Sequence, residues 1–211
     1  NLRAGSTADT FDFDAAGADV NQLYAQDSLG GGTVRARTFN RVQTRGNLTA
    51  GLDATGVDAR QGWSINQLRA ANVQDVSLNL PGGLNNVSID QWLDGGGTAD
   101  QLTAAWISTL RVSGNRRDGI AGDFQANVTL TGQDGRGTTL NNVNVNGALS
   151  GDWDLTGAGV GEVRNLRAGS TADTFDFDAP GADVNQLYAQ DSLGGGTVRA
   201  RTFNRVQTRG N

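Results

Sequence analysis

The stretch Leu140-Asn141-Asn142-Val143-Asn144-Val145 contains the pattern that decides the fold. An apolar residue and an asparagine are followed by a polar residue, and then by two apolar residues separated by a polar one. Variants of this pattern begin at Val20, Phe39, Ile65, Leu84, Ile107 and Val163. The alternation from the fourth position onward has a period of two, which indicates a β-strand with one buried face. Before that position two polar residues follow each other, which interrupts the alternation, so we expect a bend there.

Asparagine occupies the expected bend in five of the seven segments, as Asn21, Asn40, Asn66, Asn85 and Asn141. Asparagine adopts the left-handed backbone conformation more readily than most other residues, which suits a corner. Stacked asparagines can also form a ladder of amide hydrogen bonds. We therefore predict an asparagine corner at these five positions.

The seven segments are spread over 164 residues, which gives about 23 residues per unit, a spacing found in solenoid coils. Further short apolar runs, such as Leu52–Ala54 and Val128–Leu130, end at glycine turns and supply another strand to each coil. Good helix formers are scarce, because lysine is absent and Glu162 is the one glutamate. The sequence predicts an all-β fold, a right-handed parallel β-helix (β-solenoid) with about 23 residues per coil. At ~4.8 Å per coil, seven coils rise about 34 Å.

One segment interrupts the coil rhythm. Three consecutive glycines, residues 95–97, are followed by Thr98 and Gln101, which have the spacing of a helix capping box. Helix-forming residues then continue to Trp106. We therefore predict one short helical insertion near 98–106.

A second, much longer repeat sets the domain organisation. Residues 1–47 recur as residues 165–211 with a single difference, Ala16 in the first copy and Pro180 in the second. We interpret residues 1–164 as one complete tandem β-solenoid repeat and residues 165–211 as the start of the next. We expect a continuous solenoid without a linker between the two.

The asparagine positions and the coil spacing resemble the parallel β-helix family, including the asparagine ladder at one corner of pectate-lyase-like helices. They are also similar to the repetitive β-solenoid proteins of bacterial surfaces, of the giant adhesin or filament type. The resemblance implies an extended stalk or filament and covers nearly the whole chain. It rests on the Val, Leu and Asn pattern described above.

Composition excludes several classes of function. Without His or Cys, the chain has neither catalytic triads nor the usual general base, and we expect no enzyme activity. The net charge of −5 and the few interleaved aromatics disfavour nucleic-acid binding. No apolar run reaches the ~20 residues of a membrane helix, so we expect no membrane insertion. The chain also lacks Met and contains almost nothing oxidisable, which suits an extracellular or cell-surface location.

Two local charge clusters allow alternative interpretations. Asp9, Asp12, Asp14 and Asp19 could supply oxygen ligands for Ca²⁺, although no EF-hand loop or glycine-rich nonapeptide accompanies them; solvated surface carboxylates are the other interpretation. No other cofactor is expected. The basic residues Arg35, Arg37, Arg41 and Arg45 form either a solvated face or contacts between neighbouring rods, because guanidinium groups pair with carboxylates in a bidentate manner.

We predict a structural protein, a rod or filament in a surface appendage, sheath or adhesin stalk, which associates with itself end to end or laterally. The alternative is a β-helix that binds or cleaves carbohydrate, as an adhesin tip or tailspike-like domain, with a sugar or cell-surface ligand. The two hypotheses differ in where the tryptophans lie. Exposed tryptophans favour sugar binding, and lumenal ones favour a scaffold; the residues concerned are Trp63, Trp92, Trp106 and Trp153.

Overall fold

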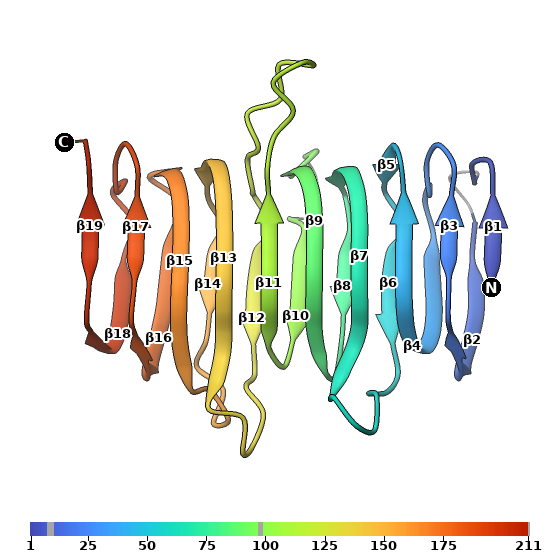
Figure 1. The fold of residues 1–211 in the computed structure, drawn as a ribbon, viewed down its shortest axis with the longest axis horizontal. Coiled ribbons are helices and arrows are strands. Elements are labelled where there is room, and N and C mark those ends of the chain that lie inside the picture. Colours follow the sequence, from blue (N-terminus) through green and yellow to red (C-terminus); the bar gives the residue numbers. More distant parts are fainter. Residues whose placement is uncertain (8–10, 97–98, 211) are drawn as a thin grey trace.

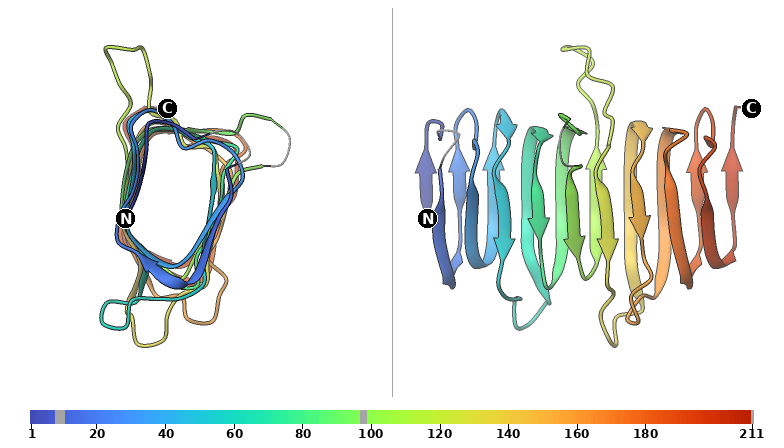
Figure 2. Two further views of the ribbon diagram at one scale, coloured as in Figure 1. Left: turned by 90° about the vertical axis from the view of Figure 1, so that its right-hand side faces the viewer. Right: turned by 180° about the vertical axis from the view of Figure 1, so that it is seen from behind.

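The protein is a single column of stacked coils with a hollow rectangular backbone outline that side chains fill (Figures 1 and 2). The computed structural model describes residues 1–7, 11–96 and 99–210. In Figure 1 the chain rises on the near side, descends on the far side and advances from right to left, which makes the coil right-handed. Each turn takes about 22 residues. The right-handed parallel β-solenoid predicted from the sequence is confirmed.

The described strands belong to one 19-stranded parallel sheet that wraps around the column, and we call its parts on the near and far sides of Figure 1 the near-side sheet and the far-side sheet. The near-side sheet contains β1 (Leu2–Ala4), β3 (Leu23–Ala25), the second half of β4 (Thr33–Thr44), β7 (Trp63–Gln74), β9 (Gly83–Leu93), β11 (Ile107–Val112), β13 (Thr138–Leu149), β15 (Glu162–Thr171), β17 (Leu187–Ala189) and β19 (Val206–Thr208). The far-side sheet contains β2 (Phe13–Val20), the first half of β4, β6 (Gly51–Ala54), β8 (Ser77–Asn79), β10 (Gln101–Ala104), β12 (Asn127–Leu130), β14 (Asp152–Asp154), β16 (Asp176–Val184) and β18 (Val198–Phe203). The short β5 (Asn47–Leu48) lies in the turn above β6.

The apolar residues at the fourth position of the repeated pattern align in one file along the near-side sheet, because the coils pair in parallel and in register at these positions. The file runs through Leu2, Leu23, Val42, Leu68, Val87, Leu110, Val143, Leu166, Leu187 and Val206. From Leu23 to Leu187 each of these side chains is buried against the coils on both sides of it. A single coil could not bury this apolar face alone, so stacking supplies the hydrophobic stabilisation.

The file continues across the predicted boundary between the two repeats. Strand β15 runs through residues 164 and 165 without interruption. Leu166 pairs with Val143 in the coil before it and with Leu187 in the coil after it. The step between repeats is therefore of the same kind as the steps within a repeat.

The predicted helical insertion near 98–106 is wrong. Gly97 and Thr98 lie outside the described residues, but Gln101–Ala104 form strand β10 rather than a helix. Leu102 pairs in register with Leu78 and Val128, and its side chain is fully buried. Burial between two coils thus overrides the local helix propensity. The described parts of the chain contain no helix of any length, and hence none that could span a membrane.

Candidate functional site

The predicted asparagine corner contains a row of amides hydrogen-bonded along the column axis. The Nδ2 of Asn40 donates to Oδ1 of Asn21, Asn66 donates to Asn40, and Asn85 donates to Asn66, each at 2.8 Å. Ser108 follows at the equivalent position of the next coil and interrupts the row. Asn141 therefore lies beyond the four-residue ladder.

The backbone at this corner differs from the expected left-handed conformation. In the described ranges Asp75, with φ of 55°, is the one residue other than glycine that has a positive φ. The asparagines bend within extended backbone, and Asn40, Asn66 and Asn85 lie inside strands. Their side-chain ladder, rather than backbone strain, accounts for asparagine at the corner.

The calcium candidates of the acidic cluster bind separate partners within the chain. Asp9 lies outside the described residues. Asp12 accepts a hydrogen bond from the backbone N–H of Thr33 at 2.7 Å, and Asp14 accepts one from Ala16 at 3.0 Å. Asp19 accepts hydrogen bonds from Thr38 and Arg37, which lower the pKa of its carboxyl group.

The four arginines proposed for contacts between rods are distributed around the coil. Arg35 forms an ion pair with Asp53, its Nε lying 2.7 Å from Oδ2, and Arg37 pairs with Asp19. Arg41 is on the near-side sheet and donates to Oε1 of Gln67 at 3.1 Å. Arg45 is exposed just after β4. The structure therefore does not gather these arginines into one patch.

All four tryptophans are buried. Trp92 and Trp153 are at most 1% exposed and belong to an edge-to-face aromatic column, in which Phe124 lies 5.2 Å from the first ring centroid and 5.6 Å from the second. The column continues to Phe175. Asp152 and Asp154 point outward on either side of the buried Trp153, as the strand alternation requires.

Trp63 and Trp106 form a separate small core with Ala105, outside the main one. The indole N–H of Trp106 donates to Oε1 of Gln133 at 2.8 Å, and the Arg136 guanidinium stacks 3.5 Å from the ring centroid. Gly83 makes room for this ring, because a Cβ at that position would overlap it. The loop after β12 thus covers Trp106.

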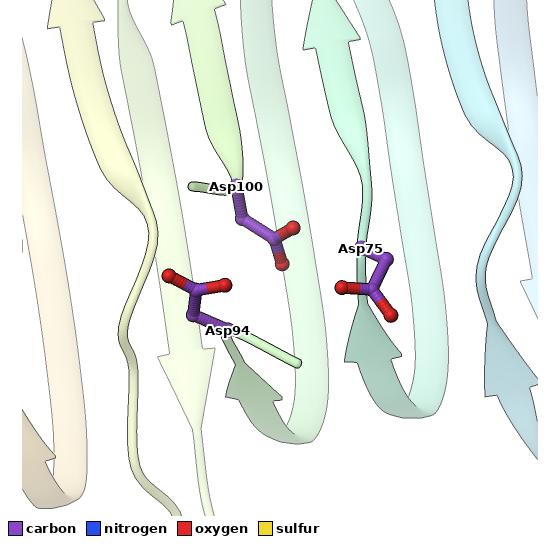
Figure 3. Close-up of side chains that lie close together, drawn as sticks. All are labelled: Asp75, Asp94 and Asp100. Carbon is purple, nitrogen blue, oxygen red and sulfur yellow. The ribbon is translucent and has the colours of Figure 1, made fainter. Parts of the chain in front are cut away.

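Three carboxylates that the sequence analysis did not single out form a cluster between neighbouring coils (Figure 3). The carboxylates of Asp75, Asp94 and Asp100 each place an oxygen within 4.8 Å of the others. Asp75 follows β7, Asp94 follows β9, and Asp100 precedes β10. Asp100 is 1% exposed, whereas the other two are exposed.

The buried Asp100 is held by two donors. Its Oδ1 accepts the backbone N–H of Val76 at 2.8 Å, and its Oδ2 accepts the indole N–H of Trp92 at 2.6 Å. Burial raises the pKa of Asp100, the two N–H donors oppose this rise, and the Asp75 and Asp94 carboxylates add to it. Carboxylate oxygens are ligands for hard cations such as Ca²⁺. Because both oxygens of Asp100 already accept hydrogen bonds, its first role is to connect Trp92 to the preceding coil through Val76.

The sequence contains a partial signal for this cluster. Asp94 directly precedes the glycine run, residues 95–97, that leads into the predicted helical insertion near 98–106. Asp75 and Asp100 are 25 residues apart, close to one coil, so a search for acidic residues at the coil spacing would have paired them. Asp94 enters the cluster through the turn after β9, which has no periodic signature.

Comparisons of the chain with protein-family models, curated proteins and solved structures find no match.

Proposed function

We propose that this protein is a structural element, a rod or filament whose length is set by the number of 164-residue units. The observation that supports this proposal most strongly is the alignment of Leu166 between Val143 and Leu187. The last coil of one unit receives the first coil of the next with the same register that coils have within a unit. Units that stack in this way add length without changing the cross-section.

Equivalent residues in the two units show what a covering coil does. Val42 is fully buried, whereas Val206, its counterpart in the second unit, is 48% exposed because no coil covers it. A further coil over Val206 would shield it as Leu68 shields Val42. Burial of these apolar positions thus depends on the neighbouring coil, as the stacking of a solenoid requires.

We place this rod outside the cell or at its surface, as a stalk, sheath or appendage. The absence of Cys, Met and His leaves few oxidisable groups, a composition that suits an oxidising environment. The carbohydrate-binding alternative receives no support from the tryptophans, since all four are buried. A flat sugar-binding platform requires exposed aromatic faces.

The proposal is tested by measuring how length depends on repeat number. Proteins with one, two and four complete units are compared by small-angle X-ray scattering and negative-stain microscopy, in about 1 M salt to suppress association. We expect each unit to add about 34 Å of length at constant width. A radius of gyration that grows as in a compact particle, with about the 0.38 power of chain length, would contradict the proposal.

A further inference from the structure

The outer surface of the near-side sheet is basic. We call it the arginine face and define it by the outward side chains of two residue files, which run from Arg3 to Gln207 and from Arg41 to Asn165. Its charged members are the exposed Arg3, Arg41, Arg69, Arg111 and Arg167. The remaining positions of both files are occupied by Gln, Asn, Ser, Thr and Tyr, so the face contains no carboxylate.

The arginines of this face have no ionic partner within the described part of the chain. Every ion pair found there involves Arg35, Arg37, Arg164, Arg199 or Arg201. The arginine face instead binds amide oxygens: Arg3 donates to Gln22 at 3.0 Å, and Arg167 donates to Asn165 at 3.2 Å. The two files that define the face therefore carry a net positive charge.

The outer surface of the far-side sheet has the opposite character. We call it the aspartate face, and its acidic members are Asp14, Asp53, Asp152, Asp154, Asp176 and Asp178. Two arginines lie in the same file, Arg35 beside Asp53 and Arg199 beside Asp178, so carboxylates remain in excess.

The excess negative charge is concentrated near β14 and β16. Asp152 pairs in register with Asp176, and Asp154 pairs with Asp178, so four carboxylates form two rows on adjacent coils. Like charges directly opposite each other in a sheet are destabilising. A cationic partner that lies across these rows would relieve the repulsion.

The two faces lie on opposite sides of the coil (Figure 2). Successive coils on both faces are ~4.8 Å apart, and the charge pattern of both recurs with each 164-residue unit, so two columns with parallel axes can place arginines beside the carboxylates of β14 and β16 in every unit. An interface between different faces of identical molecules leaves the second face of each molecule free and generates an open assembly. The planar guanidinium group of arginine can donate two parallel hydrogen bonds to one carboxylate, which suits this contact.

We propose that the arginine face of one rod docks on the aspartate face of a second copy of this chain, and that repetition of the contact builds a sheet of parallel rods. This inference rests on the proposed function, because it extends the rod laterally. The partner is a second copy because the chain itself presents the complementary surface with matching periodicity.

The test uses double variants of the 211-residue chain, each of which replaces two charged side chains with neutral amides. Arg111→Gln with Arg167→Gln neutralises part of the arginine face, and Asp154→Asn with Asp178→Asn neutralises part of the aspartate face. Arg60→Gln with Arg117→Gln is the matched control for the arginine-face variant, since it removes the same charge from exposed residues outside both files, in the connections between β6 and β7 and between β11 and β12. Sedimentation velocity, light scattering and negative-stain microscopy report association.

We expect the unmodified chain and the control to form side-by-side arrays in about 10 mM salt, where the Debye length is about 30 Å, and to separate in about 1 M salt, where it is about 3 Å. Each face variant alone should associate at least about tenfold more weakly. A mixture of the two variants should form pairs that stop at two rods, because each variant keeps one intact face.

Three results would overturn the inference: unmodified chains that stay single at low salt, face variants that associate as strongly as the control, or a mixture that does not pair. If the unmodified chains stay single at low salt and bind an anionic polysaccharide instead, the inference is overturned and the arginine face has another partner. Scattering in about 1 M salt separates this inference from the proposed function. A compact particle there contradicts the rod, whereas a rod that never pairs contradicts the lateral contact alone.

Discussion

Phe39 and Phe203 provide a direct measure of what stacking contributes, because they occupy the same position in two consecutive units of nearly identical sequence. Phe39 is fully buried between Val20 in the coil before it and Ile65 in the coil after it. Phe203 pairs with Val184 on one side and is 39% exposed. The two residues differ in whether a following coil covers them.

The expected effects of substitution follow from this difference. Phe39→Ala removes a fully buried ring and leaves a cavity, which destabilises a protein by about 3–5 kcal/mol. Full burial of a phenylalanine contributes about 1.5–3 kcal/mol, and Phe203 retains somewhat more than half of that burial with no enclosed cavity. Phe203→Ala should therefore cost about 1–2 kcal/mol, so the two substitutions should differ by at least about 1 kcal/mol.

The assay is equilibrium unfolding in urea, followed by circular dichroism and tryptophan fluorescence. Because solenoids can unfold coil by coil, agreement of the two probes is required before a free energy is assigned. A third protein, extended after Asn211 by a copy of residues 48–93, covers Phe203 with a further coil. Phe203→Ala should then be as destabilising as Phe39→Ala. Equal costs in the original chain, or an unchanged cost in the extended one, would refute the reasoning.

Three further predictions concern polar groups. Asn66→Ala removes two rungs of the asparagine ladder and should reduce the free energy of unfolding by about 1–3 kcal/mol, measured by urea titration, whereas an unchanged midpoint would show that the ladder is not stabilising. Hydrogen bonds from Arg201 and Thr202 lower the pKa of the Asp183 carboxyl group to about 2. The stability that these hydrogen bonds give the folded protein should be complete above about pH 4 and should disappear as the pH falls through 2. A carboxyl ¹³C titration that shows an ordinary pKa would contradict this. Asp75→Asn removes a like charge beside Asp100, and asparagine readily adopts the left-handed φ of this position. The midpoint of thermal unfolding at pH 7 and low salt should therefore be higher than in the unmodified chain. A lower midpoint would argue against carboxylate repulsion.

The fold could be predicted because its signals repeat. The apolar pattern and the coil spacing recur along the whole chain, and asparagine recurs in five of the seven segments, so each recurrence constrains the same parallel stack. Val143 and Val145, for example, alternate as a strand does, and both are buried in register with the coils on either side. A pattern of this kind needs no knowledge of tertiary contacts.

The features that escaped prediction depend on single tertiary contacts. The segment after Thr98 has the local chemistry of a helix start, but burial of Leu102 between two coils makes it a strand. Trp106 packs over Gly83, which lies in the preceding coil, and no sequence pattern predicts this contact. The cluster around Asp100 likewise combines residues from two connections of different length, Asp75 from the one after β7 and Asp94 and Asp100 from the one after β9.

The most direct test of the central claim is a set of spin-label distances along one outward file. Gln43, Asn144 and Gln207 belong to the same file, Asn144 four coil steps and Gln207 seven coil steps beyond Gln43. Pulsed electron resonance on labels at Gln43 and Asn144 should give about 19 Å, and labels at Gln43 and Gln207 should give about 34 Å, because each step is ~4.8 Å. Distances that do not scale with the number of coil steps would contradict a column of stacked parallel coils.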